Sequence, residues 1–321
     1  ALAITSADTS ADAIRMIGKS TGTSGDAWGI EAESALSVLA TGDGGGITIS
    51  TSQQVADNYD AVFRGETNIL AKNGPIQLLG KQDGGVANGR WFTGSNFYLG
   101  SKASSAVPNS SSNITIQYDK YNFTIYPYVA TSGLITWKPA SASFGQEVFS
   151  SWFNWNQNSQ TMSGLTIGKI GNTANMTHQT NAITVAGPIE FYAGTITLST
   201  GLTTTNNGNI SFYSDNAIGG LSAQRNVTAA GAFNYIPQSN SFSAAVTYPI
   251  TNLNLSSSGL LIGKLTNTAN ITFANATSIA GPITAYGGTI TLNANLTATN
   301  NGSISLYTDN TLGGLTTART V

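Results

Sequence analysis

A long internal repeat constrains the fold of this chain more than any other feature. Residues 164–227 and 259–321 match along almost their whole length, with Lys169 opposite Lys264 and Gly187 opposite Gly281. The match extends upstream of both segments, so the full unit is about 95 residues long. Self-similarity at a fixed period predicts either tandem domains or a solenoid of stacked coils.

A degraded third copy lies nearer the N-terminus. Gly74-Pro75-Ile76 matches Gly187-Pro188-Ile189, and residues 113–119 match 209–215. We therefore divide the chain into a degenerate part over 1–128, with a loop insertion near 81–97, and two repeat units over 129–227 and 228–321. Val321 is the counterpart of Val227, after which the sequence runs on into another unit. We expect the natural protein to continue in the same way.

Short alternating runs indicate an all-β protein. Apolar residues alternate over four to six positions, as in residues 195–198 and 289–292, and Asn-Gly or Gly-Gly signals bound the runs. A period of two predicts short, half-buried strands. Helix signals are scarce, and only residues 7–17 could form a short helix.

Two all-β architectures fit this pattern. One is a tandem array of β-sandwich domains. The other is a parallel β-helix with loop insertions, which we favour because the strands are very short, the apolar positions have small neighbours and the turns carry almost no charge. In a β-helix, Gly187-Pro188 and Gly281-Pro282 should occupy the same corner, with each proline where a strand begins.

Composition excludes several classes of function. Only 9% of residues are charged, the net charge is −2 and no basic run occurs, so we expect no nucleic-acid partner. The absence of cysteine and the presence of one histidine exclude thiolate chemistry and leave little room for a histidine-based metal site or catalytic triad. No apolar stretch reaches the roughly 18 residues of a membrane span, so we expect no membrane insertion.

The few charges of the repeat region recur at fixed positions. Asp215 and Arg225 are ten residues apart, as are Asp309 and Arg319. We predict that each pair forms a salt bridge that fixes a corner, and contacts to a ligand or a neighbouring chain are the alternative. In the first copy Asp119 has no arginine ten residues on, because position 129 is Val.

Aromatic residues concentrate between residues 91 and 155. Trp137, Trp152 and Trp155 lie there among tyrosines, phenylalanines and amides, a mixture that suits sugar binding. The alternative is a small aromatic core beneath the insertion. The later unit carries Val246, Thr247 and Pro249 near this region in place of tryptophans.

The remaining candidates for chemistry are weak. Glu31 and Glu33 would face the same side of a strand, and Asp57 and Asp60 lie near them in the sequence, which permits a calcium or catalytic role or simply a solvated strand face. His178 corresponds to Phe273 in the later unit, which favours a packing or surface site over a catalytic one. We therefore predict no catalytic residue, no metal site and no cofactor.

The motifs GLTIGK, AGPI and TTTNNGNI carry a resemblance. They resemble the repeats of giant secreted surface adhesins of Bacteroidota, including the gliding-motility adhesin, and more distantly those of filamentous-haemagglutinin-type adhesins. The resemblance covers residues 129–321 well and 1–128 loosely. It implies a right-handed β-helix, export to the outer cell surface and an adhesive or spacer role.

The leading functional hypothesis is therefore a non-enzymatic segment of a cell-surface adhesin, which serves as a stalk and a contact surface. Its partner would be an extracellular polysaccharide or neighbouring repeat units of the same chain. Two alternatives are a glycan-binding module centred on residues 91–155 and a polysaccharide-degrading β-helix enzyme. The enzyme would need two or three carboxylates in one groove.

Overall fold

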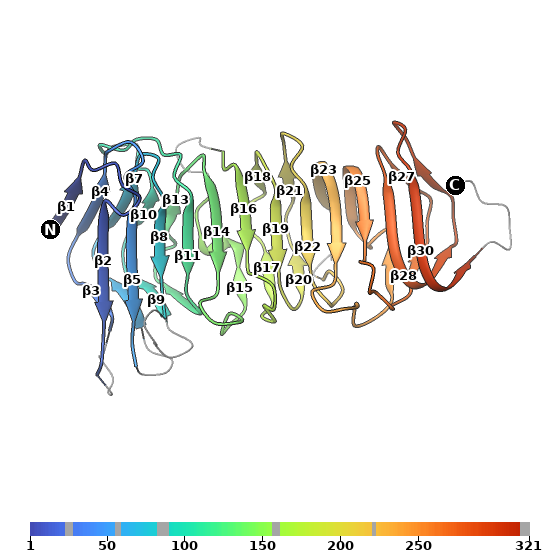
Figure 1. The fold of residues 1–321 in the computed structure, drawn as a ribbon, viewed down its shortest axis with the longest axis horizontal. Coiled ribbons are helices and arrows are strands. Elements are labelled where there is room, and N and C mark those ends of the chain that lie inside the picture. The colour runs from blue at the N-terminus through green and yellow to red at the C-terminus, as the bar shows by residue number, and fades with distance from the viewer. Residues whose placement is uncertain (23–27, 55–58, 82–89, 156–160, 220–222, 315–321) are drawn as a thin grey trace. The chain divides into compact units, whose positions relative to one another are not determined.

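A computed structural model of the chain describes residues 1–22, 28–54, 59–81, 90–155, 161–219 and 223–314 (Figure 1). Within these residues all regular structure is strand, apart from one 3-10 turn, η1 (Ser150–Trp152). The described neighbouring strands pair in parallel, in a periodic three-sheet pattern. This confirms the predicted parallel β-helix, whereas tandem sandwiches would be built from antiparallel sheets.

The chain forms two compact units, residues 1–172 and 173–321. Each coil of the first unit places one strand on each of three faces. The first face contains β1 (Leu2–Ser6), β4 (Leu36–Ala40), β7 (Thr67–Ala71), β10 (Phe97–Gly100) and β13 (Tyr128–Val129). The second face contains β2 (Ile14–Lys19), β5 (Ile47–Ser52), β8 (Ile76–Leu79), β11 (Ile114–Gln117), β14 (Leu134–Lys138) and β16 (Gly164–Ile167). The third face contains β3 (Ile30–Ala32), β6 (Tyr59–Phe63), β9 (Arg90–Thr93) and β12 (Lys120–Phe123), and β15 (Val148–Phe149) follows β14.

The second unit repeats this arrangement, and some of its strands are longer than those of the first unit. Its short strands are β17 (Met176–His178), β18 (Ile183–Val185), β19 (Ile189–Tyr192), β20 (Ile196–Leu198), β21 (Leu202–Thr204), β22 (Ile210–Tyr213), β24 (Val246–Tyr248), β26 (Ile271–Phe273), β27 (Thr277–Ile279) and β29 (Leu296–Ala298). Its long strands are β23 (Arg225–Ile236), β25 (Leu253–Ile262), β28 (Ile283–Leu292) and β30 (Ile304–Gly313). A long strand continues from one face onto the next, as β23 does by pairing with β21 and then with β22.

The proline corners are placed as the repeat predicts. Pro188 directly precedes β19 and Pro282 directly precedes β28, so each lies where a strand begins. Pro75 directly precedes β8 in the same way. Ile76 pairs with Ile114 just as Ile283 pairs with Ile304, which supports the degraded third copy.

The core is a column of stacked apolar side chains. Ile189, Ile210 and Phe233 are neighbours in register on successive coils and are fully buried. Because identical positions stack, rings also stack, as Phe191 and Phe212 do with centroids 5.6 Å apart and planes 6° apart. Burial of each such side chain stabilises the fold by about 1.5–3 kcal/mol before entropy is counted.

Two details differ from the sequence-based predictions. The possible helix over residues 7–17 is wrong, because Ile14–Lys19 forms β2, whose Ile14 side chain is buried beside Ile47 of the next coil. Strands of ten and twelve residues exceed the predicted length, because they bend around corners without leaving the ladder. The chain divides into its compact units at 172/173, and the repeat boundary drawn at 227/228 falls within β23.

Candidate functional site

A network of polar side chains fixes one corner of the first unit. The Asp119 carboxylate accepts hydrogen bonds from the Ser141 N–H (2.7 Å) and the Ser141 hydroxyl (2.6 Å), which lie on the next coil. Asn172 Oδ1 accepts from the Ser143 hydroxyl (2.8 Å) and the Phe144 N–H (3.1 Å), one coil further on. We call this arrangement the Asp–Ser–Asn corner.

The second unit contains the same corner. Asp215 Oδ1 accepts from the Ser239 N–H at 2.8 Å. Asn267 Oδ1 accepts from the Ser241 hydroxyl at 2.9 Å and from the Phe242 N–H at 3.1 Å. Because each bond links neighbouring coils, the corner explains why these polar residues recur in the repeat.

The structure does not join Asp215 to Arg225. The ion pairs among the described residues all lie between residues 31 and 102, and Arg225 Nη1 instead donates to the Gln224 carbonyl at 3.4 Å. Asp215 follows β22 on the second face, whereas Arg225 begins the part of β23 that pairs with β25 at Leu253. The intervening third-face segment therefore separates them, and the role of Asp215 is to hold Ser239.

The matching prediction for Asp309 and Arg319 cannot be followed, because Arg319 lies outside the described residues. Asp309 is exposed and lines a hollow described below.

The aromatic residues of the first unit fill the interior beside its corner. Trp91 and Trp137 are fully buried, and Trp137 contacts Phe153, Tyr121 and Phe144 with ring centroids 4.7, 5.2 and 5.8 Å apart. Trp137 presents no face to a ligand, so it is a core residue and not part of a glycan site.

Trp152 and Trp155 are half-buried at the edge of this cluster. The Trp152 ring lies against Tyr121, and the Trp155 indole N–H donates to the Ser150 carbonyl at 2.8 Å. Both side chains are therefore held by the protein itself. This arrangement favours the aromatic-core interpretation of residues 91–155.

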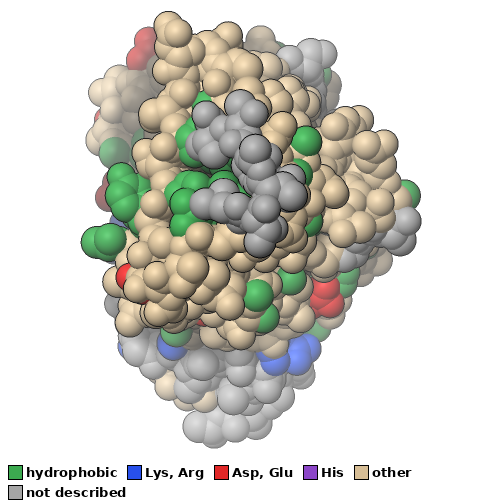
Figure 2. All heavy atoms as spheres, turned by 90° about the vertical axis from the view of Figure 1, so that its right-hand side faces the viewer, with side chains coloured by type: hydrophobic (Ala, Val, Ile, Leu, Met, Phe, Trp, Pro, Cys, Tyr) green, Lys and Arg blue, Asp and Glu red, His purple; other side chains and the backbone are tan. Residues whose placement is uncertain are grey.

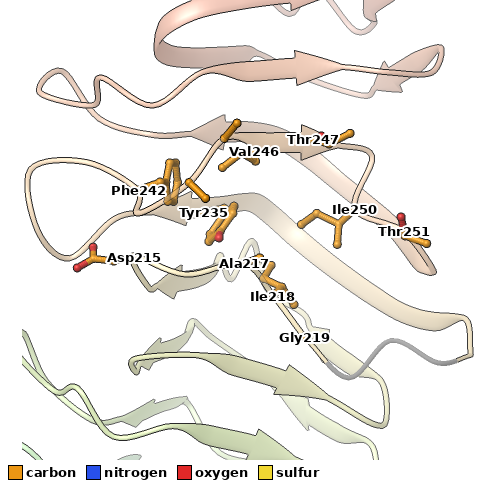
Figure 3. A pocket seen from close by; sticks show the side chains of 12 residues that line it. Asp215, Ala217, Ile218, Gly219, Tyr235, Phe242, Val246, Thr247, Ile250 and Thr251 are labelled. Atoms are coloured by element: carbon orange, nitrogen blue, oxygen red, sulfur yellow. The ribbon is translucent and has the colours of Figure 1, made fainter.

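The corresponding place in the second unit is an open pocket of about 350 Å³. Tyr235 and Phe242, with ring centroids 4.6 Å apart, lie between the 215–219 turn and the 246–251 segment, and Asp215 lies at one end (Figure 3). The Tyr235 hydroxyl donates to the Asn216 carbonyl at 2.5 Å, so this wall of the pocket is fixed. The remaining lining residues are Ala217, Ile218, Gly219, Ala244, Ala245, Val246, Thr247, Ile250 and Thr251.

Alignment of the two corners explains why aromatic rings fill the interior beside the first corner, whereas a pocket lies beside the second. Asp119 corresponds to Asp215 and Phe144 to Phe242, so Trp137 corresponds to Tyr235. From the same anchors, four aromatic residues of the first unit have smaller counterparts in the second. These replacements are Tyr121 by Ala217, Phe123 by Gly219, Trp152 by Ile250 and Phe153 by Thr251.

A repeated turn exposes an aliphatic side chain beside each corner. The Asn172 N–H bonds to the Lys169 carbonyl, and the Asn267 N–H bonds to the Lys264 carbonyl, so both segments form tight turns. Gly168 and Gly263 precede them with φ of 84° and 82°, a conformation that favours glycine. The turns leave Ile170 and Leu265 exposed by 78% and 79%.

In the second unit this turn adjoins a pair of stacked tyrosines. Tyr286 and Tyr307 lie 4.7 Å apart with planes 10° apart, and with Leu265 they line a hollow of about 380 Å³. Tyr192 and Tyr213 stack at the equivalent position of the preceding copy. Figure 2 shows that some hydrophobic side chains are exposed on the side of the molecule that faces the viewer.

Two carboxylates of the first unit come near each other, but both are buried. Burial raises the pKa of Asp60 to about 7, and the charge of Asp119 adds to this effect. Among the described residues no group of three or more acidic, histidine or cysteine side chains could hold a metal ion.

Glu31 and Glu33 face the same side, as predicted, and both accept a hydrogen bond from Arg64 Nε. Asp57 lies outside the described residues.

His178 is a buried residue of β17, so of the packing and surface sites that its exchange with Phe273 left open, it occupies a packing site. His178 pairs with Leu198 in register, just as Phe273 pairs with Leu292. Burial lowers the pKa of His178 to about 4, and Nε2 lies 3.0 Å from the Gly201 carbonyl oxygen. The ring is therefore neutral at physiological pH.

Sequence reasoning missed the pocket residues Ala217, Gly219, Ile250 and Thr251. Small and aliphatic residues carry no chemical signal of their own. The signal was their alignment with aromatic residues in the other copy, which becomes visible once Asp119 and Phe144 are used as anchors.

Comparisons of the chain with known protein families, with curated proteins and with solved structures found no match. Among the described residues there is also no helix of the length and apolarity needed to cross a membrane.

Proposed function

We propose that this chain is a non-catalytic β-helical segment of a cell-surface protein, which spaces and presents repeated contact sites. The observation that carries the proposal is the recurrence of one exposed aliphatic side chain, Ile170 or Leu265, at the apex of the same turn in two copies. A single exposed aliphatic residue is ordinary. Its repetition on a periodic scaffold gives a surface with several equivalent contacts, whose binding strengths combine.

The surroundings of Leu265 support a contact role. Tyr286 and Tyr307 stack beside it, and Tyr307 is half exposed, so the patch offers aromatic edges, hydroxyls and an aliphatic tip. Asp309 is the acid among the described residues that line the hollow, and the Lys264 ammonium group folds back to donate to the Gln238 carbonyl at 3.2 Å. This chemistry suits an uncharged partner, and we propose an extracellular polysaccharide or neighbouring repeat units. The location at the cell surface rests on the resemblance of the repeats to giant adhesins.

A test is adhesion of beads coated with the chain to polysaccharide-coated surfaces. The double variant Ile170→Asn/Leu265→Asn should reduce adhesion at least about fivefold, since two contacts are lost together. Its thermal unfolding should match that of the parent chain, because both side chains are almost four-fifths exposed. Ala276→Asn, at an exposed position outside the patch, is the matched control. Adhesion that survives the double variant would contradict the proposal.

Sedimentation of the same variants separates the two partners. If neighbouring repeat units are the partner, the parent chain should self-associate at high concentration and the double variant should not. If polysaccharide is the partner, the chain should stay monomeric and sediment with the polysaccharide only when Ile170 and Leu265 are intact.

A further inference from the structure

We propose that the 350 Å³ pocket of the second unit binds the aromatic ring of a small molecule. The inference goes beyond the contact role proposed above and does not depend on where the chain is displayed. The first unit provides the main argument, because it contains the same corner with aromatic rings already in place.

The walls of the two sites are equivalent. Phe144 and Phe242 are each held by an N–H bond of 3.1 Å to an asparagine side chain, and Trp137 and Tyr235 occupy the same strand position. In the first unit these walls contact rings of the chain itself. Trp137 lies 5.2 Å from Tyr121 and 6.3 Å from Trp152, and Phe144 lies 6.1 Å from Tyr121.

The second unit keeps the walls and lacks the rings. Ala217, Gly219, Ile250 and Thr251 stand where the first unit has four aromatic residues, and all four line the pocket. A wall that packs against rings edge-to-face in one copy offers the same geometry to an external ring in the other. A volume of 350 Å³ lies in the range of small-molecule sites.

The lining also selects among aromatic ligands. Among the described residues that line the pocket, Asp215 alone is charged, and it lies at one end. A ring that bears an anionic group is therefore disfavoured and one that bears an amine is favoured. The preferred ligand class is therefore a neutral or cationic ring of one or two fused cycles.

The first experiment titrates the full chain with indole, p-cresol and tyramine, followed by ligand-observed NMR and calorimetry. Indole should bind at one site with a roughly millimolar dissociation constant, as expected for a small fragment. Tyramine should bind several-fold more tightly than 4-hydroxyphenylacetate at low salt. Glucose is the comparison probe. The proposal would be overturned if glucose bound and indole did not. It would also be overturned if none of the aromatic probes bound at concentrations up to tenfold above the expected dissociation constant.

A filling variant tests the location. Ala217→Tyr/Ile250→Trp places the residues of the first unit into the pocket, and should weaken indole binding at least about tenfold. Ala276→Tyr, at an exposed position outside the pocket, should leave binding unchanged. Unaltered indole binding by a folded filling variant would place the ligand elsewhere and contradict the proposal.

An opening variant keeps the proposal testable if the filling variant does not fold. Tyr121→Ala/Trp152→Ile removes rings from the first unit and should create a second site, so that the indole stoichiometry rises from one to two. Indole should also raise the melting temperature of this variant more than that of the parent chain, because a ligand that binds only the folded state stabilises it. A stoichiometry that stays at one would contradict the equivalence of the two sites.

Discussion

The two copies of the Asp–Ser–Asn corner share a frame of three hydrogen bonds, but the space beside the frame is filled in one copy and open in the other. In the first unit the frame surrounds Trp137, Phe153 and their neighbours, whereas in the second it borders an open pocket. The Asn–Phe bond is 3.1 Å long in both. The comparison indicates that the frame depends on coil stacking and inter-coil hydrogen bonds, and that the rings beside it can be lost without losing the corner.

The largest expected difference concerns the wall residues themselves. Trp137→Ala should destabilise the first unit by about 3–5 kcal/mol, because it empties a fully packed site. Tyr235→Ala should cost the second unit less, about 2 kcal/mol, because this ring already faces a pocket. Urea unfolding measures both, with Leu134→Ala, a partly exposed position on the strand of Trp137, as control. Equal losses of unfolding free energy in the Trp137→Ala and Tyr235→Ala variants would contradict the claim that the first site is fully packed and the second is partly open.

The first unit should lose stability as the pH rises. Burial raises the pKa of Asp60 to about 7 from 3.8, so the folded unit holds this proton more tightly than the unfolded chain. The stabilisation is fully present below about pH 4 and is lost as the pH rises through 7, with a total on the order of 4 kcal/mol. Unfolding of the parent chain and of Asp60→Asn between pH 4 and 8 checks this, and a parallel pH dependence in both would contradict it.

The second unit should show the opposite dependence. Burial lowers the pKa of His178 to about 4 from 6.5, so the unfolded chain binds this proton more tightly. The stabilisation is fully present above about pH 6.5 and is lost as the pH falls through 4. The total loss in unfolding free energy is on the order of 3 kcal/mol. His178→Phe, which introduces the residue of the later copy, should remove this dependence. If the variant loses stability over the same range as the parent, His178 is not responsible.

The frame itself should respond equally in the two units. Asn172→Ala and Asn267→Ala each remove the acceptor of a buried phenylalanine N–H and of a serine hydroxyl. Each should cost about 2 kcal/mol, since a buried donor is left without its partner. Unfolding free energies that differ by more than about 1 kcal/mol between the two variants would show that the frames are not equivalent.

The smallest predicted effect distinguishes the two serines. Ser141 donates to the buried Asp119 carboxylate and accepts from Lys81 Nζ at 2.8 Å, whereas Ser239 donates to the Ser241 carbonyl on an exposed loop. Ser141→Ala should therefore cost about 1–2 kcal/mol and Ser239→Ala about 0.5 kcal/mol or less. Thermal unfolding of the two variants would contradict this difference if Ser239→Ala were the more damaging.

Much of the fold followed from the sequence because it depends on local pattern. Alternation predicted the short strands, and the repeated Gly-Pro predicted that β19 and β28 begin at one corner. The partner of Asp215 could not be predicted from spacing within one copy, because Ser239 approaches it from the next coil, 24 residues away. The pocket was missed for a related reason, since Ala217 and Ile250 acquire meaning only against the aromatic residues that they replace.

Hydrogen exchange of two backbone amides tests the central comparison most directly. The N–H groups of Phe144 and Phe242 make equivalent bonds, so both should exchange far more slowly than in an unfolded chain. Phe144 should be the slower of the two, by at least about tenfold, because packed rings cover its corner while Phe242 borders an open pocket. Exchange of either amide at the unfolded rate would contradict the shared hydrogen-bonded corner. Slower exchange at Phe242 than at Phe144 would contradict the claim that the first corner is covered by packed rings and the second borders an open pocket.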